Sequence, residues 1–377
     1  MMFTKEQELV RKSVREFAEK ELAPSAAEID KTGIYPKELW AKMARYNFIS
    51  ASIPKEYAGG GGGFTSLAIV IEELSKKCGA TGTLIAGNSS LFATHLYLFG
   101  TEEQKQKYLV PMAKGEKTGA FGLTEPGAGS DAASQQTTAV LEGDHYVLNG
   151  TKCFITCGAI CDFVTVIAMT DKSKGVKGLS AFIVESNWDG FKVGKNEDKL
   201  GIKGTVTSEL IFENVKVPKE NLIGREGQGF KIAMTSLESG RITVAAQALG
   251  IAQGALDEAV KYVKERKQFG KSLDKFQGLQ WMIAEMETKI NAARGLVYDA
   301  ASKKDAGLSV IKEGAMAKLY ASEVAMEVTT KALQLHGGYG YIKDYSIERM
   351  FRDAKITEIY EGTSEVQKMV IAADVLK

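Results

Sequence analysis

The segment FGLTEPGAGSD, residues 121–131, lies where the sequence changes from helical to strand-like patterns. Gly127 and Gly129 would let the backbone approach a ligand closely, and Thr124 and Ser130 supply hydroxyl groups. Successive backbone N–H groups in such a loop can also bind an anion. The same residues fit a Pro-Gly turn closed by an aspartate, so the segment alone leaves a ligand loop and a plain turn both open.

The chain before this segment predicts helices. Five successive glycines, at positions 59–63, predict a flexible loop between two helical stretches. They do not complete the dinucleotide-binding pattern GxGxxG, because Phe64 stands at its last position. Apolar residues that would share one face of the first helix are Val10, Val14, Phe17, Ala18 and Leu22.

The chain after it predicts strands and then helices again. Three short β-branched runs occur at residues 164–169, 179–184 and 208–217. HYVLNGTKCFI predicts two strands joined by a hairpin turn at Asn149-Gly150. Helical spacing returns from Gly229, with two apolar stripes formed by Leu249, Ala252, Leu256, Ala259 and Val263, and by Trp281, Ala284, Met286 and Ile290. We therefore expect an α+β protein with three domains, at residues 1–118, 119–226 and 227–377.

Composition fits this organisation and narrows the function. The 377 residues correspond to two or three domains at about 150 residues each. A net charge of +1 gives the whole chain no electrostatic preference for nucleic acid or membranes. No apolar run reaches the roughly 18 residues of a membrane-spanning helix, and the first residues do not resemble a signal or transit peptide. We expect a cytoplasmic protein that is not inserted in a membrane and does not bind nucleic acid.

Several common catalytic and metal-binding motifs are missing. Gly270-Lys271-Ser272 resembles the end of a phosphate-binding P-loop, but Glu265 stands where that motif needs glycine. No GxSxG and no complete GxGxxG after a strand occurs, which disfavours a serine hydrolase and an NAD-dependent dehydrogenase. The three histidines are scattered, and no metal site is expected. Buried thiols are the expectation for Cys153, Cys157 and Cys161.

A second informative stretch is RMFRDAKITEIYEGTSEVQ, residues 349–367. It is typical of a basic helix end followed by a polar turn. Glu361 within it is either a solvated carboxylate at a helix end or a catalytic base, and the pattern does not decide between them.

Five segments in order resemble the acyl-CoA dehydrogenase family. They are FGLTEPGAGSD, KCFITCG (residues 152–158), ERKQFGKSLDKFQ (residues 265–277), QLHGGYGY (residues 334–341) and YEGTSEVQ (residues 360–367). Five ordered matches are far more specific than any one of them. The resemblance implies an N-terminal helical domain, a middle β-barrel or sandwich, a C-terminal four-helix bundle, bound FAD, and a homotetramer built as a dimer of dimers.

The resemblance also implies roles for individual residues. Those that would line the flavin are Phe121, Leu123, Thr124, Gly129, Ser130, Phe154, Ile155 and Thr156. Those that would hold the adenosine diphosphate part of FAD from a neighbouring subunit are Arg266, Gln268, Phe276, Gln277, Gln334, Gly337 and Gly338, completed by Thr363 and Glu365. Those that would contact the substrate are Ser130, Leu237, Glu238, Arg241 and Gly362.

Glu361 would be the catalytic base that exchanges the α-proton of an acyl-CoA while flavin N5 exchanges the β-hydride. In some relatives the catalytic base lies on the helix that contains the Arg corresponding to Arg241, and there a Glu directly precedes that Arg. Here that position is Gly240, which favours Glu361. Many relatives have Asp where Glu238 stands, so the contact of Glu238 remains open.

The identity of the substrate is the property that the sequence indicates least clearly. TLIAGNSSL, residues 83–91, resembles the end of the acyl pocket, and its Ala86 and Gly87 allow a wide or deep one. We expect a short-chain acyl-CoA or enoyl-CoA, with electron-transferring flavoprotein, including a bifurcating one, as partner. A bulkier or aryl enoyl-CoA such as caffeoyl-CoA, an acyl-CoA oxidase-like enzyme and a non-enzymatic scaffold are the alternatives. The direction of the reaction is undetermined.

Overall fold

Helix α4 (Gly63–Ser75) is buried on nearly every side, between α1 (Lys5–Phe17), α5 (Gly79–Ala86) and the C-terminal helices α9 (Gly229–Glu265) and α10 (Gln277–Asp305). In the computed structural model, which describes residues 3–377, α4 carries the continuous apolar run from Leu67 to Ile71, and a helix that is apolar all round is buried. Met1 and Met2 of the predicted first domain lie outside the described residues. The helices are α1 (Lys5–Phe17), α2 (Ala26–Thr32), α3 (Lys37–Arg45), α4 (Gly63–Ser75), α5 (Gly79–Ala86), α6 (Ala93–Phe99), α7 (Glu102–Gln104) and α8 (Val110–Ala113). Between them lie π-helical turns, η1 (Ala18–Leu22), η4 (Gly87–Phe92) and η5 (Lys105–Leu109).

The middle of the chain forms one eight-stranded sheet that folds over its own core. Its path is β6-β7-β3-β2-β4-β5-β8, and β1 pairs in parallel with β4. Tyr146 of β3 meets Phe182 of β5 with ring centroids 4.8 Å apart, so the two halves of the sheet face each other. The strands are β1 (Gly119–Gly122), β2 (Thr138–Glu142), β3 (His145–Thr156), β4 (Phe163–Met169), β5 (Leu179–Glu185), β6 (Phe191–Asn196), β7 (Thr207–Pro218) and β8 (Leu222–Ile223).

The predicted hairpin at Asn149-Gly150 is wrong, because β3 runs through these residues as a single strand. The pairing of β3 with β7 shifts register between Leu148 and Gly150, which marks a β-bulge. Asn149 bonds across to Asn214, whose backbone N–H donates to the Asn149 Oδ1 at 2.8 Å. Gly150 has no room for a side chain, since a Cβ there would lie 2.4 Å from Thr137 Oγ1. Long-range pairing therefore prevails over the local turn signal.

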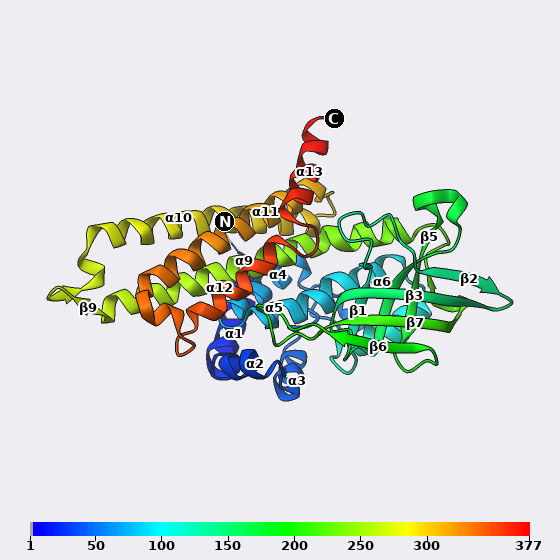
Figure 1. The fold of residues 1–377 in the computed structure, drawn as a ribbon, viewed down its shortest axis with the longest axis horizontal. Helices are drawn as coiled ribbons and strands as arrows, with labels where there is room; N and C mark the ends of the chain where they lie inside the picture. Colours follow the sequence, from blue (N-terminus) through cyan, green and yellow to red (C-terminus); the bar gives the residue numbers. More distant parts are fainter. Residues whose placement is uncertain (1–2) are drawn as a thin grey trace.

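The C-terminal region is a bundle built on one long helix, α9. Helices α9 (Gly229–Glu265), α10 (Gln277–Asp305), α11 (Ile311–His336) and α12 (Ile347–Lys355) pack along one another, and α13 (Ser364–Val375) packs on α11. A small hairpin, β9 (Lys267–Gln268) and β10 (Lys271–Ser272), links α9 to α10. At 1.5 Å per residue α9 is about 55 Å long. It runs from the sheet at one end of the molecule to this hairpin at the other (Figure 1).

Burial follows the predicted apolar stripes in α9 but only partly in α10. All five predicted residues of the α9 stripe are buried, whereas in α10 only Met286 and Ile290 are, and Trp281 and Ala284 are exposed. The four cysteines are free and buried, which confirms the expectation for Cys153, Cys157 and Cys161. Across residues 3–377, no helix combines the length and apolar character needed to cross a membrane.

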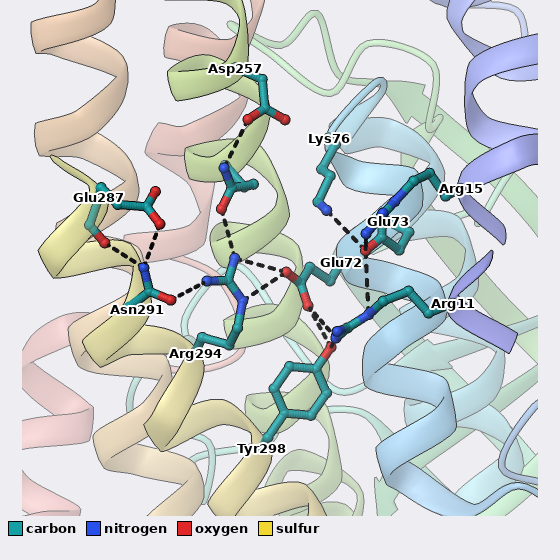
Figure 2. A network of polar contacts seen from close by, with 11 residues as sticks. Arg11, Arg15, Glu72, Glu73, Lys76, Asp257, Glu287, Asn291, Arg294 and Tyr298 are labelled. Atoms are coloured by element: carbon teal, nitrogen blue, oxygen red, sulfur yellow. Dashed lines mark hydrogen bonds and ion pairs between the residues drawn. The ribbon is translucent and has the colours of Figure 1, made fainter. Parts of the chain in front are cut away.

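Buried charges join the N-terminal helices to the bundle. Glu72 on α4 accepts hydrogen bonds from Arg294 Nε of α10, at 3.2 Å, and from the Tyr298 hydroxyl (Figure 2). Its neighbour Glu73 pairs with Arg15 of α1 at 3.1 Å. Both carboxylates are nearly inaccessible, and a buried charge is tolerated only when it is paired. The Glu72 contacts therefore fix α4 on α10, and the Glu73–Arg15 pair fixes α1 on α4.

Candidate active site

Glu361 lies in a tight turn between η10 (Ile356–Glu358) and α13. Its φ is +53° and that of Gly362 is +95°, so two consecutive residues have left-handed backbone. Such a conformation is uncommon for a residue with a side chain and marks a constrained turn. The preceding Tyr360 anchors the turn through a hydrogen bond from its hydroxyl to Gln247 of α9. The turn carries the Glu361 carboxylate inward, and its Oε2 is buried without a hydrogen-bond partner in the described part of the chain.

The carboxylate occupies space that a glycine leaves on α9. A Cβ added at Gly240 would lie 1.8 Å from Glu361 Oε2 and 3.0 Å from Leu91 Cδ2 of η4. No side chain of any kind could share this position with the carboxylate. Gly240 therefore brings Glu361 against the helix backbone directly before Arg241.

Burial dominates the electrostatics of this carboxylate. Loss of solvent raises the pKa of Glu361 to about 7, against the opposing charges of Lys318 and Arg241. Burial also lowers the pKa of Lys318 to about 8, although Glu361 favours its charged form. A carboxyl group with a pKa near neutrality can both take up and release a proton at physiological pH.

The predicted substrate residues of α9 lie within one helical turn of Gly240, which adjoins this carboxylate. Leu237 and Glu238 are half-buried and Arg241 is buried, and no described residue forms a hydrogen bond with its Nε. Burial raises the pKa of Glu238, partly offset by Lys304 and Arg241. Gly314 of α11 faces the same stretch, since a Cβ there would lie 3.6 Å from the Arg241 Cβ. Glu361, Gly362 and these α9 residues thus form one cluster.

The loop after β1 and the end of β3 form a second cluster, joined by a buried lysine. Lys152 is fully buried, and its Nζ donates to the Leu123 carbonyl at 3.1 Å and to Glu125 Oε1 at 2.7 Å. The Cys153 N–H donates to the Thr124 carbonyl at 2.9 Å. These bonds bring the predicted flavin residues Leu123 and Thr124 next to β3, the strand that carries the predicted flavin residues 154–156.

At the end of β3 a bulge turns an aromatic side chain outward. Phe154 has a φ of +57° and is 65% exposed, while Ile155 is buried and Thr156 half-buried. The Cβ position of Gly87 in η4 lies 3.7 Å from Thr156 Cγ2, so this end of β3 borders η4. Phe121 is half-buried, and Gly129 and Ser130 lie in the exposed part of the loop.

A third group lies around a pocket of about 580 Å³ at the hairpin end of the bundle. Five predicted residues line it: Arg266, Gln268, Gln334, Gly337 and Gly338. Arg266 lies over the Tyr339 ring, 5.4 Å from its centroid. A Cβ at Gly337 or Gly338 would meet no atom of the described residues within 4 Å, which leaves both backbones open to a ligand. Phe276 and Gln277 lie at the start of α10, outside this lining.

The structure does not bring all of the predicted flavin residues together in one chain. The hairpin β9–β10 and the sheet occupy opposite ends of the long axis (Figure 1). Thr363 caps α13, accepting from the Val366 N–H at 3.4 Å, and Glu365 lies in the first turn of that helix. Neither lines the pocket at the hairpin. The predicted cofactor residues thus fall into separate groups within a single copy.

Three buried polar side chains were not predicted as site residues from the sequence: Lys318 of α11, Lys152 and Glu125. Gly240 was recognised as the residue before Arg241, but the space that it leaves for Glu361 is visible only in the structure. One sequence pattern could have indicated that Lys318 is buried. It is the one charged residue on a helix face otherwise formed by small or apolar residues, namely Gly314, Ala321, Ala325 and Val328.

Comparison with known proteins identifies the family. Three models match consecutive parts of the chain: the N-terminal domain of acyl-CoA dehydrogenase at residues 4–116, its middle domain at residues 120–215 and its C-terminal domain at residues 227–376. The fold and the order of the elements agree with this assignment.

Full-length relatives point the same way. The short-chain specific acyl-CoA dehydrogenase of Clostridium acetobutylicum is 60% identical, with 99% of each chain covered. Subunit CarC of the caffeyl-CoA reductase-Etf complex of Acetobacterium woodii is 50% identical, with 100% of each chain covered. The structure of butyryl-CoA dehydrogenase from Megasphaera elsdenii superposes with a TM-score of 0.98 at 50% identity, again over 100% of each chain. This chain belongs to the acyl-CoA dehydrogenase family and is an oxidoreductase.

Proposed function

We propose that this protein uses FAD to dehydrogenate a short-chain acyl-CoA between its α and β carbons, or to reduce the corresponding enoyl-CoA. Glu361 is the residue that exchanges the α-proton. The observation that carries the proposal is its buried Oε2, which has no hydrogen-bond partner among residues 3–377 and lies in the space left by Gly240. A buried, unpartnered carboxylate oxygen is costly, and such groups are concentrated at functional sites.

In the dehydrogenation direction the Glu361 carboxylate takes the α-proton, the β-hydrogen leaves with the electron pair of its bond, and a C=C bond forms between the two carbons. Bound FAD would supply the two-electron acceptor for that hydrogen. Exclusion of water around Glu361 raises its proton affinity towards that needed for a carbon acid. In the reverse direction protonated Glu361 delivers the proton to the α carbon.

Residues of this chain fit FAD on chemical grounds. The open Gly337 and Gly338 backbones and the Arg266 guanidinium suit a diphosphate, and Tyr339 offers an aromatic face. The exposed Phe154 and the loop after Leu123 suit a flat, partly apolar ring. Because these groups lie at opposite ends of one chain, the proposal requires a second copy to complete each cofactor site, within the expected homotetramer.

The proposal extends to domain limits, substrate and partner. We place the domains at residues 1–118, 119–226 and 227–377. A short acyl chain agrees with the Clostridium acetobutylicum and Megasphaera elsdenii relatives. An aryl enoyl-CoA is the second candidate, and the name of the Acetobacterium woodii relative favours it. The absence of a side chain at Gly87, next to Thr156, also favours it, because it allows a wider acyl pocket. The same relative's name supports electron-transferring flavoprotein as the partner.

The test is anaerobic titration of the purified protein with a panel of acyl-CoA and enoyl-CoA thioesters, followed by flavin absorbance, with and without electron-transferring flavoprotein. Glu361→Gln should keep the yellow colour and bind acyl-CoA but lose flavin reduction by more than about 10³-fold, since it cannot accept the proton. Glu213→Gln, which changes an exposed carboxylate on β7, is the matched control and should react as the parent does.

Near-normal reduction of Glu361→Gln would remove Glu361 from this role. A colourless protein that FAD cannot reconstitute would exclude a flavoenzyme altogether. Rapid peroxide formation in air would instead identify an oxidase.

A further inference from the structure

Lys318 is a lysine without access to solvent, placed beside the turn that carries Glu361. Its side chain is fully buried on α11, which is rare for lysine because its ammonium group loses its hydration. Its Nζ donates a hydrogen bond of 2.8 Å to the Gly362 carbonyl. The buried ammonium is therefore directed at the backbone of this turn.

A second buried side chain holds the same carbonyl. Gln367 of α13 donates through Nε2 to the Gly362 carbonyl at 2.8 Å, and more weakly to the Glu361 carbonyl at 3.4 Å. Both acceptor positions of the Gly362 oxygen are thus used. Since Glu361 and Gly362 both have left-handed backbone, the turn needs surrounding contacts to persist. Lys318 and Gln367 supply two of them.

The charge of Lys318 acts on the carboxylate as well. The charged groups that face Glu361 are Lys318 from α11 and Arg241 from α9. Those that face Lys318 are the carboxylates of Glu361, Glu358 and Glu365 and the guanidinium of Arg241. Lys318 is therefore one of two cations that favour the ionised form of Glu361.

We propose that Lys318 is a positioning residue for catalysis: it holds the Gly362 carbonyl, and through it the inward orientation of Glu361, and it supplies a positive charge that keeps the carboxylate ionised. The inference rests on the proposed role of Glu361 as the proton-exchanging group. A lysine that merely fastened α13 to α11 would affect stability and leave the proton affinity of Glu361 unchanged.

The experiment compares Lys318→Met, Lys318→Arg and Gln367→Leu in the purified holoenzyme. Proton binding to Glu361 is measured directly by the pH dependence of its carboxyl C=O infrared band, assigned by subtraction of Glu361→Gln. Flavin reduction by butyryl-CoA is measured in parallel over the same pH range, with kcat and KM separated.

Lys318→Met should raise the pKa of Glu361 by about one unit, the lower end for loss of a close opposite charge. Below that pKa the ionised fraction, and with it kcat for dehydrogenation, should fall about tenfold while KM changes little. A decrease in kcat that persists at high pH, where Glu361 is ionised in every variant, measures the loss of its correct orientation. Gln367→Leu should show that persistent deficit without the pKa shift, and Lys318→Arg should restore the parent pKa.

An unchanged infrared pKa and pH profile in Lys318→Met, with only a lower unfolding temperature, would overturn the proposal. If Lys318→Met does not fold, Lys318→Gln removes the charge while keeping an N–H donor, and the same comparison decides. If no thioester reduces the parent protein, the proposed function fails, but the infrared titration still tests the effect of Lys318 on Glu361.

Discussion

Replacing Gly240 by alanine adds one methyl group at the point where Glu361 is held. The new Cβ would lie 1.8 Å from Oε2 and 3.0 Å from the Glu361 Cδ. For ordinary van der Waals contact at 3.4 Å the oxygen must retreat by about 1.6 Å. The carboxylate is the end of a flexible side chain, so the protein can make this movement without unfolding.

Stability and activity should therefore separate in Gly240→Ala. Alanine in a helix interior is favoured over glycine by up to about 1 kcal/mol, which offsets part of the local rearrangement. We expect an unfolding temperature within a few degrees of the parent. A catalytic group misplaced by about 1 Å costs about 10²-fold in rate, so flavin reduction should fall at least that far.

The assay is anaerobic stopped-flow reduction of the flavin by butyryl-CoA, combined with thermal unfolding. Gly295→Ala in α10 is the control, because a Cβ there meets nothing within 4 Å among the described residues. It should be as stable as the parent or slightly more so, with unchanged turnover. A folded Gly240→Ala protein that turns over within about threefold of the parent would show that the carboxylate need not occupy this space.

Two further predictions concern the stability contributed by buried ionisable residues in the middle domain and the N-terminal helices. Lys152→Met should leave buried Glu125 without its cation and lower the free energy of unfolding by about 3–5 kcal/mol, measured in urea, and the double variant with Glu125→Gln should recover part of the loss. Burial lowers the pKa of His95 to about 3, below its unfolded value near 6.5. The unfolded chain then binds more protons between these values, so stability should fall by up to about 2 kcal/mol from pH 7 to pH 5, and His95→Gln should flatten that dependence. A urea midpoint that is equal at both pH values, in the parent protein, would contradict this assignment.

Local patterns were sufficient wherever an element depends on its own residues. The runs at residues 164–169, 179–184 and 208–217 became β4, β5 and β7, because β-branched side chains suit a buried strand wherever it pairs. The Asn149-Gly150 signal misled because pairing with β7 over more than 60 residues of sequence outweighs a two-residue turn. Exposed Trp281 misled likewise, since helical spacing does not say which face another helix covers.

The candidate site shows the same division. The order of five motifs along the chain was enough to indicate the family, because each motif is local and the resemblance needs no coordinates. The residues next to Glu361 in the sequence could not distinguish a solvated carboxylate from a catalytic base. The two differ in burial of the side chain, and that burial depends on packing against α9 and α11.

By itself the sequence determined the three-part α+β organisation and the position of Glu361 in a motif, since both depend on residues close together in the chain. Only the tertiary structure decided that Gly240 lies against that carboxylate and that Lys318 and Gln367 bond to the carbonyl of the next residue, Gly362. It alone also placed the hairpin that begins with β9 far from β1 and the loop that follows it. The physical reason is that proton affinity and ligand geometry come from solvent exclusion and contacts between distant segments, which no local pattern encodes.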